Sequence, residues 1–540
     1  MALSPVSPTP EQESPGEASV AAVVGDREWG GPSVISTGVA LGVTMLALLA
    51  ATVVGVRQAR DGIETIEEFL SARNTAGVAP VAASLVATAL GTWILFSPAE
   101  AGAEFGGLTA VFGYAVGMGI PLALFATVGV RIRRLVPHGH SVTEFVLARY
   151  GRVMYLVVLA VSAAYMFVFL TVELVSIAAA LAIVADVPPP VTAGLVGVFV
   201  FAYTGYGGIV ASIVTDTAQT LVMLPLLAVS FAGIVAALGG TDTIYAHVLA
   251  AEPALLSLSN GDGLRFGLYV GIALVGANVL NQGLWQRVYA ADSDQTVRVA
   301  FAVAAAAVVP VILLSGLFGL AAAGLGLVEH GGHAAFFRVL LATGPDWSVL
   351  LAVVVAVLLV MTSADSLLSG LASLALHDLP RVVDRLDPGQ EDHEKAELLA
   401  ARLITGVFAA AAVVASAAQF SEIRLFLTVD LLSAATFVPV LVGAYTGEVP
   451  EWAAMAAAVG GSVAATALDP VFRVLWETLA PVSVAAALPA ASFTRSFVVA
   501  VTVSGALTAL GAIVSGETVD LDRLEQRVDR LGGQTEESQP

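Results

Sequence analysis

The 540-residue sequence contains no cysteine and a single lysine, Lys395, and only 12% of its residues are charged. Without cysteine there are no disulfides, thiolate metal sites or thiol nucleophiles. The 23 cationic residues stand against 43 acidic ones, so nucleic acid is not an expected partner. The motifs HExxH, Gly-x-Ser-x-Gly and Asp-Asp are also missing. We therefore expect the protein not to be an enzyme.

Apolar residues, in contrast, are abundant: they make up 57% of the chain, and the mean hydropathy is +0.88. This composition predicts an all-α polytopic membrane protein, because a helix that crosses a bilayer needs about 20 apolar residues. About thirteen apolar spans are predicted, at 34–56, 80–100, 108–130, 153–183, 190–207, 214–239, 265–289, 299–327, 347–376, 400–420, 424–446, 451–469 and 491–515.

Two polar tails flank the predicted membrane domain, which covers residues 34–515. Residues 1–33 are rich in Pro, Ser and Glu and lack the basic and short apolar regions of a signal peptide, so we expect a disordered tail. Residues 516–540 form the other tail. With the N-terminus outside, inward-facing segments hold 17 cations and outward-facing segments hold 6. The positive-inside rule therefore predicts a cell-membrane protein with its C-terminus in the cytoplasm.

The ninth span carries polar residues where hydrocarbon is expected. Up to Val360 it is apolar, and it then continues through Thr362, Ser363, Asp365 and Ser366. An ionisable group at this depth costs at least ~2.5 kcal/mol and marks a candidate ion or ligand site. Hydroxyl and backbone oxygens beside one carboxylate suit a small hard cation. The alternative is that the hydroxyls bond neighbouring helices or their own backbone carbonyls.

The second span is interrupted by helix-breaking residues. Gly91 and Pro98 lie within it, and interrupted helices of this kind line transporter sites near the bilayer midplane. A simple proline kink is the alternative. In the sixth span Asp216 and Gln219 share one helix face, or else Asp216 caps a helix start.

The polar residues at other positions within apolar sequence each have two interpretations. Glu173 and Asp430 are either structural hydrogen-bond acceptors or parts of a polar path. The amides of Asn278, Asn281, Gln282 and Gln286 either face a cavity or join helices. The seven histidines all fall in predicted loops. Two pairs, His138/His140 and His330/His333, have metal-like spacing without a visible third ligand, so we expect them in solvated loops.

Three motifs in order resemble the sodium/solute symporter family, which contains sodium-coupled proline, pantothenate, urea and glucose carriers. They are Gly-Gly-x-x-Ala-x-x-x-Thr-Asp-x-x-Gln at 207–219, Asn-Gln to Gln-Arg followed by Ala-Ala-Asp-Ser at 281–293, and Thr-Ser-Ala-Asp-Ser running to His-Asp-Leu at 362–379. The resemblance covers about residues 36–450. It implies a LeuT-like core of two five-helix inverted repeats, at about 80–239 and 265–446, with the remaining spans peripheral.

The resemblance also implies a sodium site between the second and ninth spans. Thr362 and Ser363 match the family's hydroxyl pair, and the carbonyl of Leu359 matches the oxygen one turn earlier. Aligning Pro98 on the family's proline gives the carbonyls of Val86 and Ala89. Aligning Pro80 instead gives Ala89 and Thr92, and Ala99 replaces the family's usual glycine after Pro98.

By the same resemblance Asp216 is tied to sodium coupling, and we assign Asp365 to coupling as well. A solute would lie beside the break in the second span, between Thr92 and Trp93 on one side and Asn281 on the other.

The function that follows is sodium-coupled symport, by alternating access, of a small organic solute into the cell. Candidate solutes are an amino acid such as proline, a short carboxylate or a urea-like compound. The expected partners are the solute, Na⁺ and the lipid bilayer, and no oligomeric state is predicted. Two alternatives stay open. One is proton coupling through Asp365, Glu173 or Asp430. The other is a membrane sensor, which is disfavoured because the chain ends about 25 residues after its last span without a kinase-like domain.

Overall fold

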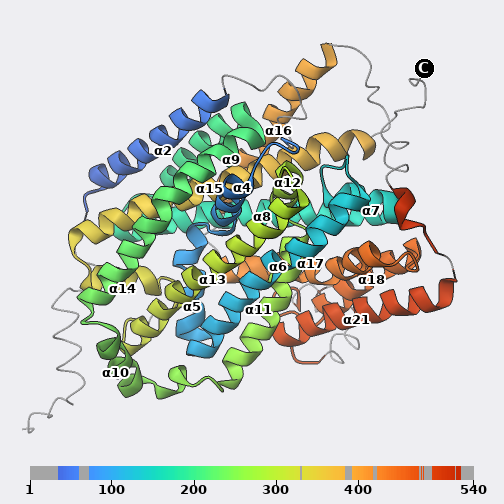
Figure 1. Cartoon of the computed structure of the whole chain (residues 1–540). Coiled ribbons are helices and arrows are strands. Elements are labelled where there is room, and N and C mark those ends of the chain that lie inside the picture. The colour runs from blue at the N-terminus through green and yellow to red at the C-terminus, as the bar shows by residue number, and fades with distance from the viewer. Residues whose placement is uncertain are drawn as a thin grey trace, which may run out of the picture.

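The structure is a computed structural model (Figure 1). It describes residues 35–59, 72–328, 331–382, 392–417, 422–473, 476, 478, 489–516 and 518–524. The predicted N-terminal tail and most of the predicted C-terminal tail therefore lie outside the described residues, apart from residue 516 and a short segment with one 3₁₀ turn, η3 (Leu521–Arg523).

The described residues form helices joined by short connections, and the predicted all-α class is confirmed. The first half of the chain contains α2 (Thr37–Ala59), α4 (Val78–Ala89), η1 (Thr92–Leu95), α5 (Ser97–Glu104), α6 (Gly107–Leu135), α7 (Val142–Tyr150), α8 (Arg152–Ala185), α9 (Pro189–Ala237), α10 (Thr241–Ala251) and η2 (Pro253–Leu256). The second half contains α11 (Gly261–Val279), α12 (Gln282–Ala290), α13 (Asp294–Gly324), α14 (Ala335–Thr343), α15 (Asp346–Val382), α16 (Asp392–Ser416), α17 (Glu422–Tyr445), α18 (Glu451–Thr466) and α21 (Phe493–Ser515).

Within the described residues, eight helices are long and apolar enough to cross a membrane, and ten if each of two bent pairs counts as one span. The predicted number of thirteen is not confirmed. Two further predicted spans correspond to the shorter apolar stretches Pro189–Ala202 and Arg402–Ser416, and the twelfth corresponds to α18, which has only 16 residues. The most buried spans are α8 and α15, which therefore form the centre of the bundle.

The second predicted span is broken rather than kinked. Helix α4 ends at Ala89 because Leu90 and Gly91 have extended backbones, and the chain resumes as η1 and α5 at an angle of 57°. Pro98 lies in the first turn of α5, where its missing N–H leaves no helical hydrogen bond unmade. The proline therefore starts a helix, and the alternative of a simple proline kink is wrong.

The seventh predicted span is also broken, which the sequence prediction of one continuous helix missed. Helix α11 ends at Val279, and α12 starts at Gln282 with a bend of 55°. The reason is local: the Asn281 side chain accepts a hydrogen bond from Gly283 N–H and caps α12. Broken helices thus stand near the start of both predicted repeats.

The predicted turn between the fifth and sixth spans is a sharp kink where two helical segments of α9 meet. Gly208 has a non-helical backbone there (φ 52°, ψ −153°). A positive φ favours glycine because that residue has no Cβ. Gly208, the second glycine of the motif at 207–219, therefore marks the kink just before the polar segment of α9.

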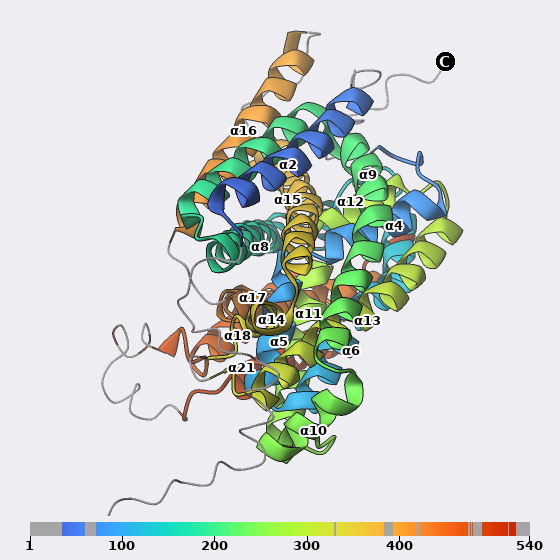
Figure 2. The same cartoon turned by 90° about the vertical axis from the view of Figure 1, so that its left-hand side faces the viewer.

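The remaining helices cover the bundle. Helix α2 lies along α9 on one side, and α18 and α21 lie side by side at the opposite edge (Figure 1). Figure 2 shows α2 and α16 following α9 on the same face. The two broken spans are joined at one end, where Thr75 N–H donates to the Ala290 carbonyl and Asp292 N–H donates to the Ala76 carbonyl. Ser293 then caps α13, which gives the Ala-Ala-Asp-Ser motif a structural role.

Candidate functional site at the break of α4

The hydroxyl pair of α15 faces the interior of the bundle. Thr362 and Ser363 are both fully buried, so neither side chain faces lipid. Both hydroxyls donate to the carbonyl of Leu359 at 3.0 Å. These are the bonds to the helix's own backbone carbonyls that the sequence offered as the alternative to an ion site. The Leu359 oxygen and the two hydroxyl oxygens thereby lie within one turn of helix.

The broken end of α4 lies against the same part of α15. Its last carbonyls, including that of Ala89, lie at a helix C-terminus, where backbone oxygens lack helical partners and carry partial negative charge. The Val86 carbonyl accepts the Leu90 N–H at 3.0 Å. On either side of the break, Thr88 bonds the Ser366 hydroxyl at 2.9 Å and Thr92 donates to the Ala356 carbonyl at 2.9 Å. The chain is thus tied to α15 on both sides of the break.

A buried carboxylate completes this region. Glu173 reaches the break from α8, is fully buried, and accepts the Thr92 N–H at 2.8 Å. Its side chain lies beside the Ser363 hydroxyl. It also fills the space where a Cβ on residue 91 would stand, so only glycine fits at Gly91 without displacing it. The sequence marked Glu173 as a carboxylate in apolar surroundings, but only the fold brings it to the break.

A second polar group lies one to two helical turns from the break of α4 and from the hydroxyl pair of α15. It surrounds a fully buried arginine. We call it the arginine cluster; its members are Arg287, Asp216, Asp365, Ser84, Ser212 and Ser366. Arg287 Nη2 lies 3.0 Å from Asp216 Oδ2, and both side chains are fully buried. Arg287 also donates to Ser84, Ser212 and Ser366 at 2.6–3.0 Å.

The arginine cluster links the two residues predicted to act in coupling. Ser212 donates to Asp365 at 3.2 Å and lies 3.4 Å from Asp216. Asp216 sits in the interior of α9, so the alternative of an N-cap is wrong. The sequence placed Arg287 among the cations of the inward-facing segments, at the inner end of the seventh span; the structure buries it in α12. The available signal was its place in an amide-rich segment between apolar residues.

Next to the break is a cavity enclosed by α4, η1, α6, α8, α11, α12 and α17. Its lining consists of Thr88, Ala89, Trp93, Tyr114, Met118, Tyr165, Phe169, Val270, Ala273, Leu274, Asn278, Asn281, Leu284, Ile423, Phe426, Leu427 and Asp430. Five of these residues are aromatic and one is acidic. The rings touch each other: Trp93 stacks on Tyr114 at 5.9 Å and meets Phe426 edge-on at 5.7 Å between centroids.

Two polar groups of the cavity are unsatisfied. Asp430 is 3% exposed, and its Oδ1 atom has no hydrogen-bond partner. Among the described residues no cation pairs with Asp430. The Trp93 indole N–H is likewise buried without an acceptor. Burying a charge is costly unless it is paired, so this cavity favours a ligand that brings a positive charge or N–H donors.

The predicted substrate residues fall on two sides of the break. Trp93 and Asn281 line the cavity, and Asn281 also interacts with the Tyr165 hydroxyl. Thr92 is not part of the lining; its N–H and its hydroxyl are directed to Glu173 and Ala356. Sequence reasoning did not single out the aromatic lining from α6, α8 and α17, because those rings look like ordinary core residues.

The histidines also differ from expectation. His247, His377 and His393 lie in helices rather than loops. His140 contacts Glu144 at 3.6 Å, and its side chain is only 15% exposed. His333 lies between two acidic side chains, 2.9 Å from Glu422 and 3.7 Å from Glu100. Burial of this ring lowers its pKa, but the two carboxylates outweigh burial and raise the pKa of His333 to about 10. His330 lies outside the described residues.

The bundle of long apolar helices with two broken spans has a LeuT-like fold. A solved structure of a Na⁺-coupled sialic acid symporter, in a substrate-bound outward-open state, matches 89% of this chain and 98% of its own with a TM-score of 0.71 at 15% identity. The nucleobase-cation-symport-1 transporter MHP1, in a closed conformation with bromovinylhydantoin bound, matches 85% and 98% with a TM-score of 0.50 at 14% identity. At these identities the likeness establishes the fold alone.

The family follows from the sequence. The model of the sodium:solute symporter family matches residues 68–461, and the chain belongs to that family. It is 29% identical to the "Spermidine transporter DUR31" of Candida albicans over 58% of this chain and 60% of that protein. It is 24% identical to the "Probable urea active transporter 1" of Schizosaccharomyces pombe over 47% of this chain and 40% of that protein. The matched region thus spans 60% or less of these curated relatives.

Proposed function

We propose that this transporter couples the entry of sodium to the import of a small organic cation across the cell membrane. The main support is the break of α4, because Thr88 before it and Thr92 after it bond to α15 on either side of the buried hydroxyl pair. Inward movement of one charge down the membrane potential would contribute about 2.3 kcal/mol per 100 mV. The orientation needed for import, with the N-terminus outside, rests on the distribution of cations along the chain.

The proposed sodium site uses the Ala89 carbonyl of α4 and the Leu359, Thr362 and Ser363 oxygens of α15, with Val86 contributing its second lone pair. Carbonyl and hydroxyl oxygens are suitable ligands for a hard cation. The partial negative charge at the C-terminus of α4 and the Glu173 carboxylate favour a cation at this point. A bound ion would bridge α4 and α15 and so bias the two arrangements of the transporter, which is the requirement for coupling.

The proposed solute is a protonated amine. Asp430 is the acidic group of the cavity and has no cationic partner among the described residues, while the surrounding rings offer π-faces that attract cations. A neutral urea-like solute could donate N–H bonds to Asp430 but would leave its charge uncompensated. The spermidine transporter among the relatives is a protein named for a polyamine, which supports the same choice.

Sodium dependence tests the first part. The chain, reconstituted in vesicles, should take up its solute faster with an inward sodium gradient. Thr362→Ala and Ser363→Ala should each raise the sodium concentration for half-maximal uptake by ~10-fold or more, because each removes one proposed ligand, while leaving protein abundance unchanged. Ser462→Ala is a matched control, because this hydroxyl bonds its own helix in peripheral α18. Wild-type uptake without sodium in the Thr362/Ser363 double variant would refute the site.

A solute panel tests the second part. Putrescine, spermidine, urea, proline and acetate should be offered with and without sodium, and we expect sodium-dependent uptake of the amines alone. Asp430→Asn keeps the size of the side chain and removes its charge, so it should raise KM for amines at least ~10-fold, because a buried charge contact contributes more than 1.4 kcal/mol. Uptake of urea but not of amines, unchanged by Asp430→Asn, would contradict the proposed solute class.

Proton coupling is the competing account, and Glu173 is the observation in its favour. A carboxylate buried beside the hydroxyl pair is a group that carries a proton as readily as it attracts sodium. Uptake driven by a pH gradient in sodium-free buffer, abolished by Glu173→Gln, would establish this alternative in place of sodium symport.

A further inference from the structure

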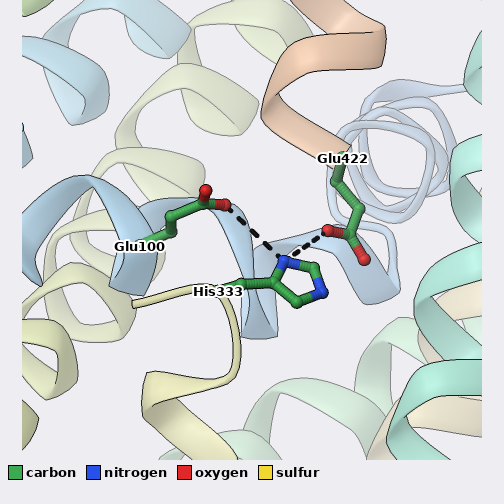
Figure 3. Close-up of side chains that lie close together, drawn as sticks. All are labelled: Glu100, His333 and Glu422. Carbon is green, nitrogen blue, oxygen red and sulfur yellow. Dashed lines mark ion pairs between the residues drawn. The ribbon is translucent and has the colours of Figure 1, made fainter. Parts of the chain in front are cut away.

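Three side chains from distant parts of the chain meet on one side of the cavity. Glu100 comes from α5, His333 from the turn before α14 and Glu422 from the first residue of α17 (Figure 3). One ligand atom from each lies within 4.8 Å of the other two. Glu422 is fully buried and Glu100 is 6% exposed, whereas the His333 side chain is 39% exposed. The three side chains thus form a pocket of ligands with one side open to solvent.

His333 forms ion pairs with both carboxylates, but the geometry of these contacts is not that of hydrogen bonds. His333 Nδ1 lies 2.9 Å from Glu422 Oε2 and 3.7 Å from Glu100 Oε2. Nevertheless, none of these three buried atoms makes a well-aligned hydrogen bond. Buried polar atoms are normally hydrogen-bonded, and an ion or water bound at the point where these three converge would satisfy them. Three converging donors around one point are the arrangement that a metal ion requires.

The donor types select the class of metal. Imidazole nitrogen and carboxylate oxygen are both ligand types that zinc accepts, and open zinc sites have three protein ligands with water in the fourth position. Calcium and magnesium prefer oxygen ligands alone, whereas imidazole suits zinc and its transition-metal neighbours. A divalent cation would displace the proton from the imidazole nitrogen into solvent, and the two carboxylates would then balance its two positive charges.

We propose that Glu100, His333 and Glu422 form a binding site for a zinc-class divalent cation, and that the bound ion closes this side of the transport path. The site lies next to the cavity: Glu422 precedes Phe426 of the lining by one turn, and the Phe96 ring lies 5.4 Å from His333 and three residues beyond Trp93. The ion would join α5, the segment before α14 and α17, which must separate to admit solute on this side. Its inhibitory effect rests on the proposed transport function; its binding does not.

Zinc binding to the purified full-length protein in detergent is the direct test. After EDTA treatment and exchange into chelator-free buffer, equilibrium dialysis against Zn²⁺ should show one high-affinity ion per wild-type chain. His333→Ala and Glu422→Gln each remove a direct ligand, so each should weaken that site more than the ~10–100-fold caused by loss of outer-shell partners. His247→Ala is the matched control, because this histidine lies on α10 and is not one of the three grouped ligands. This variant should bind zinc like wild type.

Two outcomes would overturn the proposal. Equal zinc binding by wild type and His333→Ala would show that these three residues are an ion pair only. A loss shared equally by His247→Ala would show adventitious binding to histidines. The apparent unfolding midpoint without metal should be recorded for each variant, and Glu100→Gln provides a further ligand variant if one of the others fails to fold. Zinc should also inhibit uptake by wild type but not by Glu422→Gln; tight binding without inhibition would confirm the site and refute the closure.

Discussion

Replacing Arg287 should destabilise the protein more than replacing either carboxylate of the arginine cluster. The cluster holds one guanidinium and two carboxylates. Arg287→Met leaves Asp216 buried without its guanidinium partner and removes the donors to Ser84, Ser212 and Ser366, whereas Asp216→Asn keeps those three donors. At 3.0 Å and an effective dielectric constant of ~20, the Arg287–Asp216 attraction is about 5 kcal/mol. Removing one partner of a buried pair typically costs ~3–5 kcal/mol.

The population of open molecules is the suitable readout, because membrane proteins often unfold irreversibly. A cost of ~3 kcal/mol or more raises the open fraction about a hundredfold or more, and limited proteolysis in detergent tracks that fraction when opening is fast. Arg287→Met should be digested fastest, and the Asp216→Asn/Arg287→Met double variant should recover part of the loss. Arg265→Met is the matched control: its pair with Asp262 has a similar length, 3.1 Å, but is exposed and should contribute less than ~1 kcal/mol. Digestion of Arg287→Met no faster than Asp216→Asn would refute the charge argument.

Three further predictions concern single positions. Gly91→Ala should displace Glu173 from the Thr92 N–H and reduce uptake several-fold, while the fold is retained. Uptake assays and gel filtration would check these two expectations. Uptake at the wild-type rate would contradict the packing at the break. Gly319→Ala should lower stability by ~1–3 kcal/mol, because its Cβ would meet the backbone of α5, whereas Gly271→Ala on α11 has free space and should be neutral in thermal unfolding. The two carboxylates raise the pKa of His333 to about 10 from a usual value near 6.5. The ion pairs of His333 therefore contribute stability that is fully present below pH 6.5 and is lost as the pH rises through 10. The difference in unfolding midpoint between wild type and His333→Gln, measured without metal, should shrink over that range.

Several parts of the candidate site were predictable because the signal was local. Thr362, Ser363 and Asp365 stood out as polar residues in an apolar helix, and they are buried in the bundle. Gly91 and Pro98 indicated an interruption near the correct place. The break at Asn281 was missed, because asparagine in a membrane helix can either bond a neighbour or cap a new helix, and the sequence does not distinguish these roles.

Partners far apart in the chain were not predictable from spacing. His333 showed only its neighbour His330, whereas the acidic side chains that surround it come from positions 100 and 422. Arg287 was counted among the inward-facing cations because it lies at the inner end of the seventh predicted span. The structure instead buries it against Asp216 of a different helix. The aromatic lining of the cavity had no periodic signal that differs from that of an ordinary core.

The sequence alone determined the membrane-spanning class, the helical fold, the family and the hydroxyl pair of α15, because hydropathy, turn residues and motifs are properties of short segments. The tertiary structure alone decided which charges face each other: Arg287 with Asp216, Glu173 with the break of α4, and His333 with its two carboxylates. The physical reason is that a buried charge requires a partner within a few ångströms. Which residue comes that close depends on how helices far apart in the chain pack together.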